Sequence, residues 1–175
     1  MSNAFSHLLV LGGARSGKSR FAQGRAEALT GKLVYLATAQ AFDEEMRERI
    51  ALHRADRGTR WSTVEAPLEL AETITACSTS ETVVLVDCLT LWASNLMMAD
   101  RDMAAATEGL VRAVLAARGP IILVANEVGL GIVPDNALAR RFRDVAGRIN
   151  QEMAAAADEV VMMFAGLPLA LKSKG

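Results

Sequence analysis

Five short runs of apolar residues are spaced along the chain, and none of them alternates with polar side chains. The runs are rich in Val, Ile and Leu, which is typical of strands buried on both faces of a parallel sheet. They predict strands over 7–11 (HLLVL), 32–37 (KLVYLA), 82–87 (TVVLVD), 120–125 (PIILVA) and 159–164 (EVVMMF).

Segments with a helical pattern separate these runs. They predict helices over 19–30, 43–56, 67–77, 103–118 and 136–157. In the last one, an apolar stripe recurs at steps of three and four residues: Leu138, Phe142, Val145, Ile149 and Met153. The stretch 88–102 stays open between helix and loop. Alternating strands and helices predict an α/β fold with a mostly parallel central sheet and helices on both faces. No linker, repeat or charge block interrupts the pattern, so we expect one domain over residues 1–175.

Polar residues follow four of the predicted strands. A glycine-rich loop follows the first, Thr38-Ala39-Gln40 follows the second, Asp87 ends the third, and Asn126-Glu127 follows the fourth. In parallel sheets, ligands bind outside the carboxyl ends of the strands. The four clusters therefore predict a single ligand site at that edge.

The glycine-rich loop carries a phosphate-binding motif. Gly12-Gly13-Ala14-Arg15-Ser16-Gly17-Lys18-Ser19 matches G-x-x-x-x-G-K-[ST] at every position. The glycines let backbone N–H groups point at phosphate oxygens, and the following helix adds its positive end. We expect Lys18 to reach the β- and γ-phosphates and the Ser19 hydroxyl to ligate Mg²⁺. The alternative is a glycine-rich turn that closes a strand–helix unit, but the flanking strand and helix favour the phosphate loop.

Asp87 ends an apolar run, which is the position of a Walker-B carboxylate that assists magnesium. The alternative is a cap or a turn residue, since Asp is common at turns. The nearby phosphate loop favours the metal role.

His53 lies on the apolar side of the predicted 43–56 helix, with Met46 and Ile50. The residues alone favour a partly buried histidine with a structural role. The alternative is a nucleophile, because imidazole can attack phosphorus and form a phosphoramidate. Nearby arginines, among them Arg54 and Arg57, could neutralise phosphate charge or form a solvated basic face.

The segment Asn126–Pro134 leads from a strand end through a glycine-rich loop into the longest helix. Glu127 could act as a base, as part of a metal shell or as a contact to a nucleotide base or ribose. The alternative is a structural loop with a capping acid. Loops at this edge of a scaffold often carry function.

Composition excludes several classes of function. Of the 175 residues 51% are hydrophobic, and the formal net charge of -1 offers no basic surface for nucleic acid. No apolar run approaches the ~20 residues that a membrane helix needs. The start of the chain lacks the pattern of a secretion signal. Cys77 and Cys88 have no metal-ligand spacing, which fits a reducing cytoplasm.

Several segments together resemble the bifunctional adenosylcobinamide kinase/adenosylcobinamide-phosphate guanylyltransferase family of cobalamin biosynthesis. The resemblance covers essentially the whole chain, and the last segments named make it specific. It rests on the stretch 61–65 and on GGARSGKSRFA (12–22), VYLATAQ (34–40), MRERIALHRADR (46–57), VDCLTLWASNL (86–96), AAADEVVMMFAGLPL (155–169), ANEVGLGIVP (125–134) and LARRFRDVAGRINQ (138–151).

The resemblance implies two reactions. In the first, ATP or GTP phosphorylates the aminopropanol hydroxyl of adenosylcobinamide. In the second, a histidine attacks the α-phosphorus of GTP, and adenosylcobinamide phosphate then takes the GMP to give adenosylcobinamide-GDP. His53 matches the guanylylated histidine of the family. The resemblance also implies Mg²⁺, a RecA-like P-loop fold, a homotrimer, and a GTP site made of residues 12–19, Thr38, Ala39, Gln40, Arg54, Ala55, Asp56, Arg57, Glu65 and Asp87.

Rival functions stay open at this stage. A P-loop small-molecule kinase without nucleotidyl transfer would use the phosphate loop and Asp87 but leave His53 idle. A GTP-binding switch is a weaker alternative, because the chain has Asn126-Glu127-Val128-Gly129 where such switches use Asn-Lys-x-Asp. A family member that has lost the kinase half is also compatible with the sequence.

Overall fold

The computed structural model describes residues 6–40 and 59–173. Their strands form one sheet in the order β3-β2-β4-β5-β1-β6-β7. All neighbouring strands are parallel except β6 and β7, which form an antiparallel hairpin. The strands are β1 Leu8–Gly12, β2 Lys32–Ala37, β3 Trp61–Glu65, β4 Thr82–Asp87, β5 Ile121–Asn126, β6 Glu159–Phe164 and β7 Leu167–Lys172.

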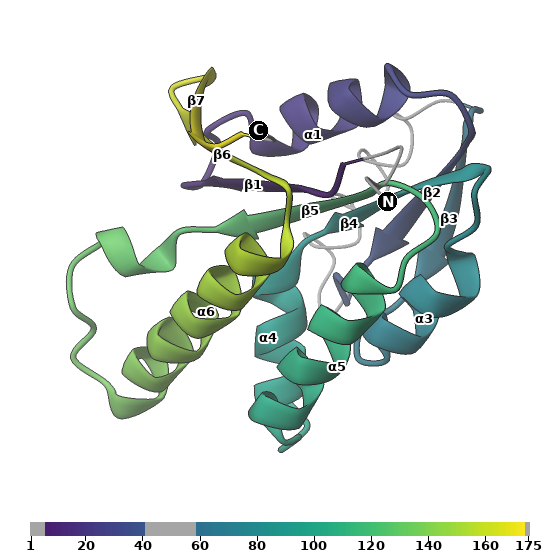
Figure 1. Ribbon diagram of the computed structural model, residues 1–175. Coiled ribbons are helices and arrows are strands. Elements are labelled where there is room, and N and C mark those ends of the chain that lie inside the picture. The colour runs from purple at the N-terminus through teal and green to yellow at the C-terminus, as the bar shows by residue number, and fades with distance from the viewer. Residues whose placement is uncertain (1–5, 41–58, 174–175) are drawn as a thin grey trace.

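Helices cover both faces of the sheet, as the sequence predicted. Figure 1 shows α1 on one face and α3, α4, α5 and α6 on the other. The helices are α1 Lys18–Glu27, α3 Leu70–Cys77, α4 Leu89–Met98, α5 Met103–Leu115 and α6 Ala137–Ala156, with the short 3-10 helix η1 at Val128–Leu130. The predicted helix over 43–56, which carries His53, lies outside the described residues.

The alternation of side chains along the central strands divides the core between the two faces. In β1, Leu9 and Leu11 join the core beneath α3 to α6, whereas Leu8 and Val10 join the core beneath α1. Burying apolar side chains on both faces explains why these strands show no polar alternation in the sequence. All five predicted strands are present within one residue of their expected ends.

Two strands were not predicted, and both lie at the edges of the sheet. In β3, Trp61 is half-buried and the other residues are exposed, while every residue of β7 is exposed. Such strands lack the continuous apolar pattern of a buried strand. β3 is held partly by its first side chain, since Trp61 Nε1 donates to Glu27 Oε1 at 2.9 Å. Hydrogen bonds from Gln23 and then Trp61 hold the pKa of Glu27 below its ordinary value.

Helix boundaries differ from the prediction mainly where local capping decides them. The open stretch 88–102 contains α4, and Asp102 then caps α5 by accepting from Ala104 N and Ala105 N at 3.0 Å each. The long helix begins after Asn136, whose side chain accepts from Ala139 N at 2.7 Å. Leu138 was expected on the buried stripe, but it lies in the first turn and is 69% exposed.

Candidate nucleotide site

The four polar clusters predicted from the sequence lie at one edge of the sheet, which we call the carboxyl edge. In the register of the strands, Gly12 faces Asn126, and Ala37 faces both Asp87 and Glu65. The last residues of β1, β2, β4 and β5 therefore lie within two residues of one another along the strand direction. This arrangement confirms that these segments come together, although they are far apart in the sequence.

The phosphate loop has the backbone conformation that its glycines allow. Gly17 has a φ of 91° and Arg15 a φ of 54°. Gly12 is closely surrounded, because a Cβ placed on it would lie 2.4 Å from Ser16 Oγ and 3.1 Å from the Met163 carbonyl oxygen. A side chain at this position would have to shift the Ser16 hydroxyl and would crowd the Met163 backbone.

Lys18 reaches back across the loop. Its Nζ donates to the Gly13 carbonyl oxygen at 3.0 Å, and within the described residues it forms no ion pair. Ser16 Oγ is buried and has no hydrogen-bond partner among the described residues. A cation held only by a neutral carbonyl and a buried hydroxyl without a partner both suit an anionic ligand in the loop.

The hairpin of β6 and β7 supports the phosphate loop from the side. Gly166, in the turn of this hairpin, donates its N–H to the Ser16 carbonyl oxygen at 3.0 Å. Its Cα would also lie 3.4 Å from a Cβ on Gly17. The unpredicted strand β7 thus brings a second glycine turn against the loop.

Asp87 lies half-buried at the end of β4, where the sequence placed the metal-assisting carboxylate. The next residue, Cys88, is buried. Burial raises the pKa of the Cys88 thiol to about 11, and the charge of Asp87 adds to this shift. The thiol is therefore protonated at neutral pH and is a poor nucleophile or metal ligand.

Thr38 is fully buried beside Cys88. Its hydroxyl donates to the Cys88 carbonyl oxygen at 2.7 Å and accepts from the Cys88 N–H at 2.8 Å. The side chain of this predicted nucleotide residue therefore holds β2 and β4 together at the carboxyl edge. Ala39 and Gln40, which follow it, are half-buried.

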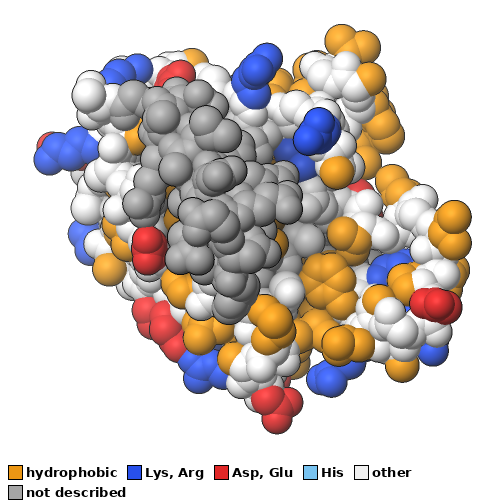
Figure 2. All heavy atoms as spheres, turned by 180° about the vertical axis from the view of Figure 1, so that it is seen from behind, with side chains coloured by type: hydrophobic (Ala, Val, Ile, Leu, Met, Phe, Trp, Pro, Cys, Tyr) orange, Lys and Arg blue, Asp and Glu red, His pale blue; other side chains and the backbone are white. Residues whose placement is uncertain are grey.

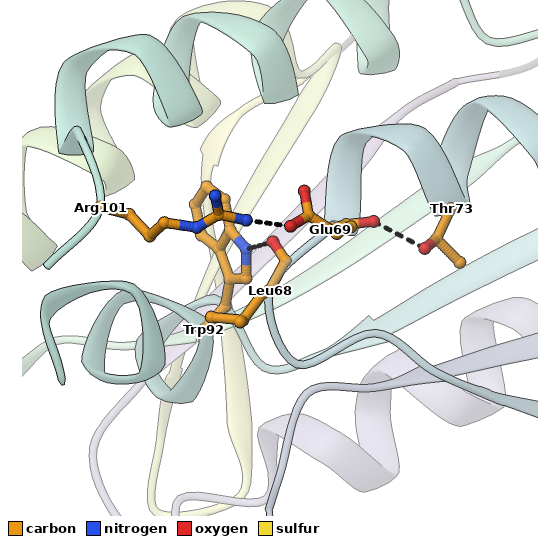
Figure 3. Close-up of polar contacts among 5 residues, drawn as sticks. All are labelled: Leu68, Glu69, Thr73, Trp92 and Arg101. Carbon is orange, nitrogen blue, oxygen red and sulfur yellow. Dashed lines mark hydrogen bonds and ion pairs between the residues drawn. The ribbon is translucent and has the colours of Figure 1, made fainter. Parts of the chain in front are cut away.

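Two helix residues fix the loop that follows the exposed Glu65. Asn95 on α4 is buried, and its amide donates to the Thr38 carbonyl oxygen at 2.8 Å and to the Pro67 carbonyl oxygen at 3.0 Å. One turn away, Trp92 Nε1 donates to the Leu68 carbonyl oxygen at 2.8 Å, as Figure 3 shows.

The start of α3 is held in the same place. Arg101 forms an ion pair with Glu69, whose carbonyl oxygen accepts from the Thr73 hydroxyl at 2.6 Å (Figure 3). These contacts give the segment after β3 a defined path beneath the carboxyl edge. The sequence offered no signal for the ion pair, because Arg101 lies in the stretch 88–102 that stayed open between helix and loop.

The segment after β5 is tied to both the phosphate loop and α6. Glu127 donates its N–H to the Gly12 carbonyl oxygen at 3.2 Å, and Asn126 donates its N–H to Thr90 Oγ1 at 2.7 Å. Asn150 on α6 donates to Glu127 Oε1 at 2.7 Å and to the Asn126 carbonyl oxygen at 3.2 Å. Sequence reasoning missed Thr90 and Asn150, although a buried asparagine inside an amphipathic helix is a signal for a specific partner.

The residues present fit a nucleotide phosphate with a magnesium ion. Mg²⁺ at phosphates uses few protein ligands and keeps several waters. The Ser19 hydroxyl, in the first turn of α1, and the Asp87 carboxylate would be ligands of this kind. Within residues 6–40 and 59–173, no group of three or more His, Cys, Asp or Glu is placed to hold a metal by itself.

A parallel sheet with a complete phosphate loop at its carboxyl edge defines a P-loop nucleotide-binding protein of the α/β class. Two solved structures share this fold. The first is the flagellar accessory protein FlaH from Methanocaldococcus jannaschii, with a TM-score of 0.53 and 14% identity over 96% of this chain and 78% of that chain. The second is the ATPase EscN of the enteropathogenic Escherichia coli type III secretion system, with a TM-score of 0.58 and 14% identity over 97% of this chain and 48% of that chain. At these identities the likeness concerns the fold alone.

Sequence comparison narrows the class to one family. A family model described as cobinamide kinase / cobinamide phosphate guanyltransferase matches residues 8–171. The chain belongs to this family and is an enzyme of adenosylcobalamin biosynthesis. It is 47% identical to the bifunctional adenosylcobalamin biosynthesis protein CobP of Pseudomonas aeruginosa, over 95% of this chain and 97% of the relative. It is 44% identical to the corresponding protein CobU of Escherichia coli, over 94% of this chain and 99% of the relative.

Proposed function

We propose that this enzyme carries out both family reactions on one Mg²⁺-dependent GTP site, over a single domain of residues 1–175. The observation that carries the proposal is the complete phosphate loop beside Asp87 and Glu127 at the carboxyl edge. The proposed nucleotide residues are Gly12, Gly13, Ala14, Arg15, Ser16, Gly17, Lys18, Ser19, Thr38, Ala39, Gln40, Arg54, Ala55, Asp56, Arg57, Glu65 and Asp87, of which 54–57 lie outside the described residues.

In the kinase step, the hydroxyl oxygen of adenosylcobinamide attacks the γ-phosphorus of ATP or GTP. The bond from the γ-phosphorus to the bridging oxygen breaks, and the nucleoside diphosphate leaves. Lys18 and the loop N–H groups neutralise charge on the phosphate oxygens. A magnesium ion on Ser19 and Asp87 would supply further charge neutralisation.

In the second step, the His53 imidazole attacks the α-phosphorus of GTP, and pyrophosphate leaves. A phosphate oxygen of adenosylcobinamide phosphate then attacks the same phosphorus, the phosphorus–nitrogen bond breaks, and adenosylcobinamide-GDP forms. A neutral imidazole is needed for the attack, and an unperturbed histidine, with a pKa of about 6.5, is mostly neutral at pH 7. His53 lies outside the described residues, so its role rests on the family resemblance.

The experiment uses GTP labelled at either the α- or the γ-phosphorus, with Mg²⁺. After denaturation, we expect acid-labile α-label on the protein and none in His53→Ala. A second assay follows γ-label into adenosylcobinamide, and His53→Ala should retain this reaction. Retained α-label in His53→Ala would contradict the nucleophile. A wild-type enzyme that phosphorylates but is never labelled would favour the rival kinase without nucleotidyl transfer.

We also propose that the enzyme forms a homotrimer that acts on small molecules and does not act on nucleic acid. Exposed apolar side chains support an assembly, and Figure 2 shows hydrophobic side chains over the hairpin of β6 and β7 at the upper right. In this hairpin Leu167 is 71%, Leu169 51% and Leu171 58% exposed. Sedimentation equilibrium should give three chains for the wild type and fewer for Leu169→Glu, while Leu115→Glu on α5 serves as an exposed control.

The proposed location is the cytoplasm. Cys77 and Cys88 are both free thiols, which is the state that a reducing compartment maintains. No helix among the described residues has the length and hydropathy to cross a membrane. Cell fractionation with an antibody to the chain tests the location, and enrichment in an oxidising compartment would contradict it.

A further inference from the structure

Glu127 is a carboxylate at the carboxyl edge that a buried side chain holds in place. The amide of Asn150, only 6% exposed, donates both to Glu127 Oε1 at 2.7 Å and to the Asn126 carbonyl oxygen at 3.2 Å, within the described part of the chain. One amide thus fixes the end of β5 and the side chain that follows it. An amide uses both of its N–H donors in this way only when the two acceptors are correctly placed.

The backbone of Glu127 is fixed against the phosphate loop as well. Its N–H donates to the Gly12 carbonyl oxygen at 3.2 Å, and Gly12 is the first residue of the loop. The preceding residue, Asn126, donates its N–H to Thr90 Oγ1 on α4. Glu127 itself is half-buried, so its second oxygen can meet a ligand. Arg143 Nε and Glu127 Oε2 each lie 4.0 Å from where a Gly129 Cβ would be, so both side chains border the glycine loop that follows Glu127.

Asp87 and Glu127 occupy different positions relative to the loop. β5 lies between β1 and β4 in the sheet, so Glu127 is one strand away from the loop and Asp87 two. Adjacent strands are about 4.8 Å apart. Asp87 faces Val124, two residues before Asn126, so Glu127 also projects beyond it by roughly 10 Å along the strands, at ~3.3 Å per residue.

We propose that Glu127 accepts the proton of the acceptor hydroxyl in the kinase step and that Asn150 is its positioning residue. This inference rests on the kinase half of the proposed function. As the hydroxyl oxygen bonds to the γ-phosphorus, its O–H bond breaks and the proton moves to Glu127 Oε2. The nucleoside diphosphate leaves with the electron pair of the broken phosphorus–oxygen bond. Asp87 would hold the magnesium ion, and a carboxylate bound to a metal would not also take the proton.

Comparing the two reactions of the enzyme distinguishes a general base at Glu127 from a purely structural role. The guanylyl step needs no base for its acceptor, because a phosphate oxygen is already an anion. Glu127→Gln should therefore lower kcat of the kinase reaction about 10²–10⁴-fold, the contribution of a general base. It should still acquire label from α-labelled GTP and transfer GMP to acceptor that was phosphorylated beforehand. Retained labelling also reports that the variant is folded.

Asn150→Ala should lower kcat of the kinase reaction less, about tenfold, and leave KM for the nucleotide unchanged. Added to Glu127→Gln it should cause no further loss, since a positioning residue acts only through its partner. Gln151→Ala and Glu152→Gln, exposed neighbours on α6, are the matched controls and should behave as wild type. Their activity in both reactions sets the range of unspecific effects.

Three results would overturn the proposal. They are a Glu127→Gln variant with wild-type kinase activity, a variant that loses both reactions, and additive losses in the double variant. A wild-type enzyme that neither phosphorylates the acceptor nor acquires label would instead contradict the proposed function itself.

Discussion

Replacing Thr38 by valine tests whether this residue serves the fold or the nucleotide. Valine has the shape of threonine but lacks the hydroxyl that donates to the Cys88 carbonyl oxygen and accepts from the Cys88 N–H. The site is fully buried, so water cannot replace the lost contacts. The substitution therefore removes two hydrogen bonds while leaving the packing nearly unchanged.

The two losses differ in size. The Cys88 carbonyl oxygen also accepts from Trp92 N at 3.2 Å, so losing the hydroxyl there costs only about 0.5–1 kcal/mol. The Cys88 N–H loses the hydroxyl acceptor, and a buried donor left without a partner costs about 1–3 kcal/mol. Together we expect the free energy of unfolding to fall by about 1.5–4 kcal/mol. For a chain of this size that lowers Tm by roughly 3–16 °C.

Urea unfolding measures this change, with Thr38→Ser as the matched control. Serine keeps both hydrogen bonds and loses one methyl group, so its free energy of unfolding should fall by about 1 kcal/mol. Well below its Tm, Thr38→Val should bind GTP within about threefold of wild type, because its hydroxyl is already engaged. A variant of unchanged stability that binds GTP more than tenfold more weakly would refute this reasoning.

Three further predictions follow from single contacts. Gly12→Ala should weaken GTP binding at least tenfold in equilibrium titration, because its Cβ would lie 2.4 Å from Ser16 Oγ. The control is Gly24→Ala, whose Cβ would have nothing within 4 Å. This control should raise the free energy of unfolding by about 0.5–1 kcal/mol. The lowered pKa of Glu27 means that the folded state favours the ionised carboxylate. The stability that this carboxylate contributes is therefore complete above the ordinary pKa of 4.5 and is lost as pH falls through the lower pKa of the folded state. Acid titration of unfolding should therefore be flatter for Glu27→Gln, and an identical slope would contradict this. The raised pKa of Cys88, about 11, should make its thiol unreactive to iodoacetamide at pH 8 until the protein unfolds, with mass spectrometry as the readout.

The fold was predictable from the sequence as far as its pattern was periodic. Central strands such as 82–87 are buried on both faces and therefore have a continuous apolar signature. The edge strands β3 and β7 have no such signature, because β7 is exposed throughout and its sequence includes Pro168. The hairpin of β6 and β7 is nevertheless what brings Gly166 against Ser16. The sequence therefore did not predict this part of the site, because an exposed strand has no continuous apolar pattern.

The candidate site was predictable where a motif has fixed spacing. The phosphate loop needs its residues in one order, so it can be recognised in any chain. For Asp87 and Glu127 the sequence predicted a place at the carboxyl edge but not their positions relative to each other, because local sequence does not determine the register between strands. Which of them lies next to the loop depends on the strand order, in which β5 separates β1 from β4. The sequence therefore favoured Asp87 as the metal-assisting carboxylate but left the role of Glu127 open.

Two buried asparagines show how the helices beneath the sheet shape this edge. Asn95 on α4 links the segments after β2 and β3, and Asn150 on α6 links the last residue of β5 to Glu127. Each amide donates to two acceptors, and an apolar side chain would cost about 1–3 kcal/mol for each acceptor that is buried and left without another donor. Because these bonds form within the protein itself, the loops have defined positions before any nucleotide binds. Binding energy that would otherwise order the loops is then available to act on the phosphates.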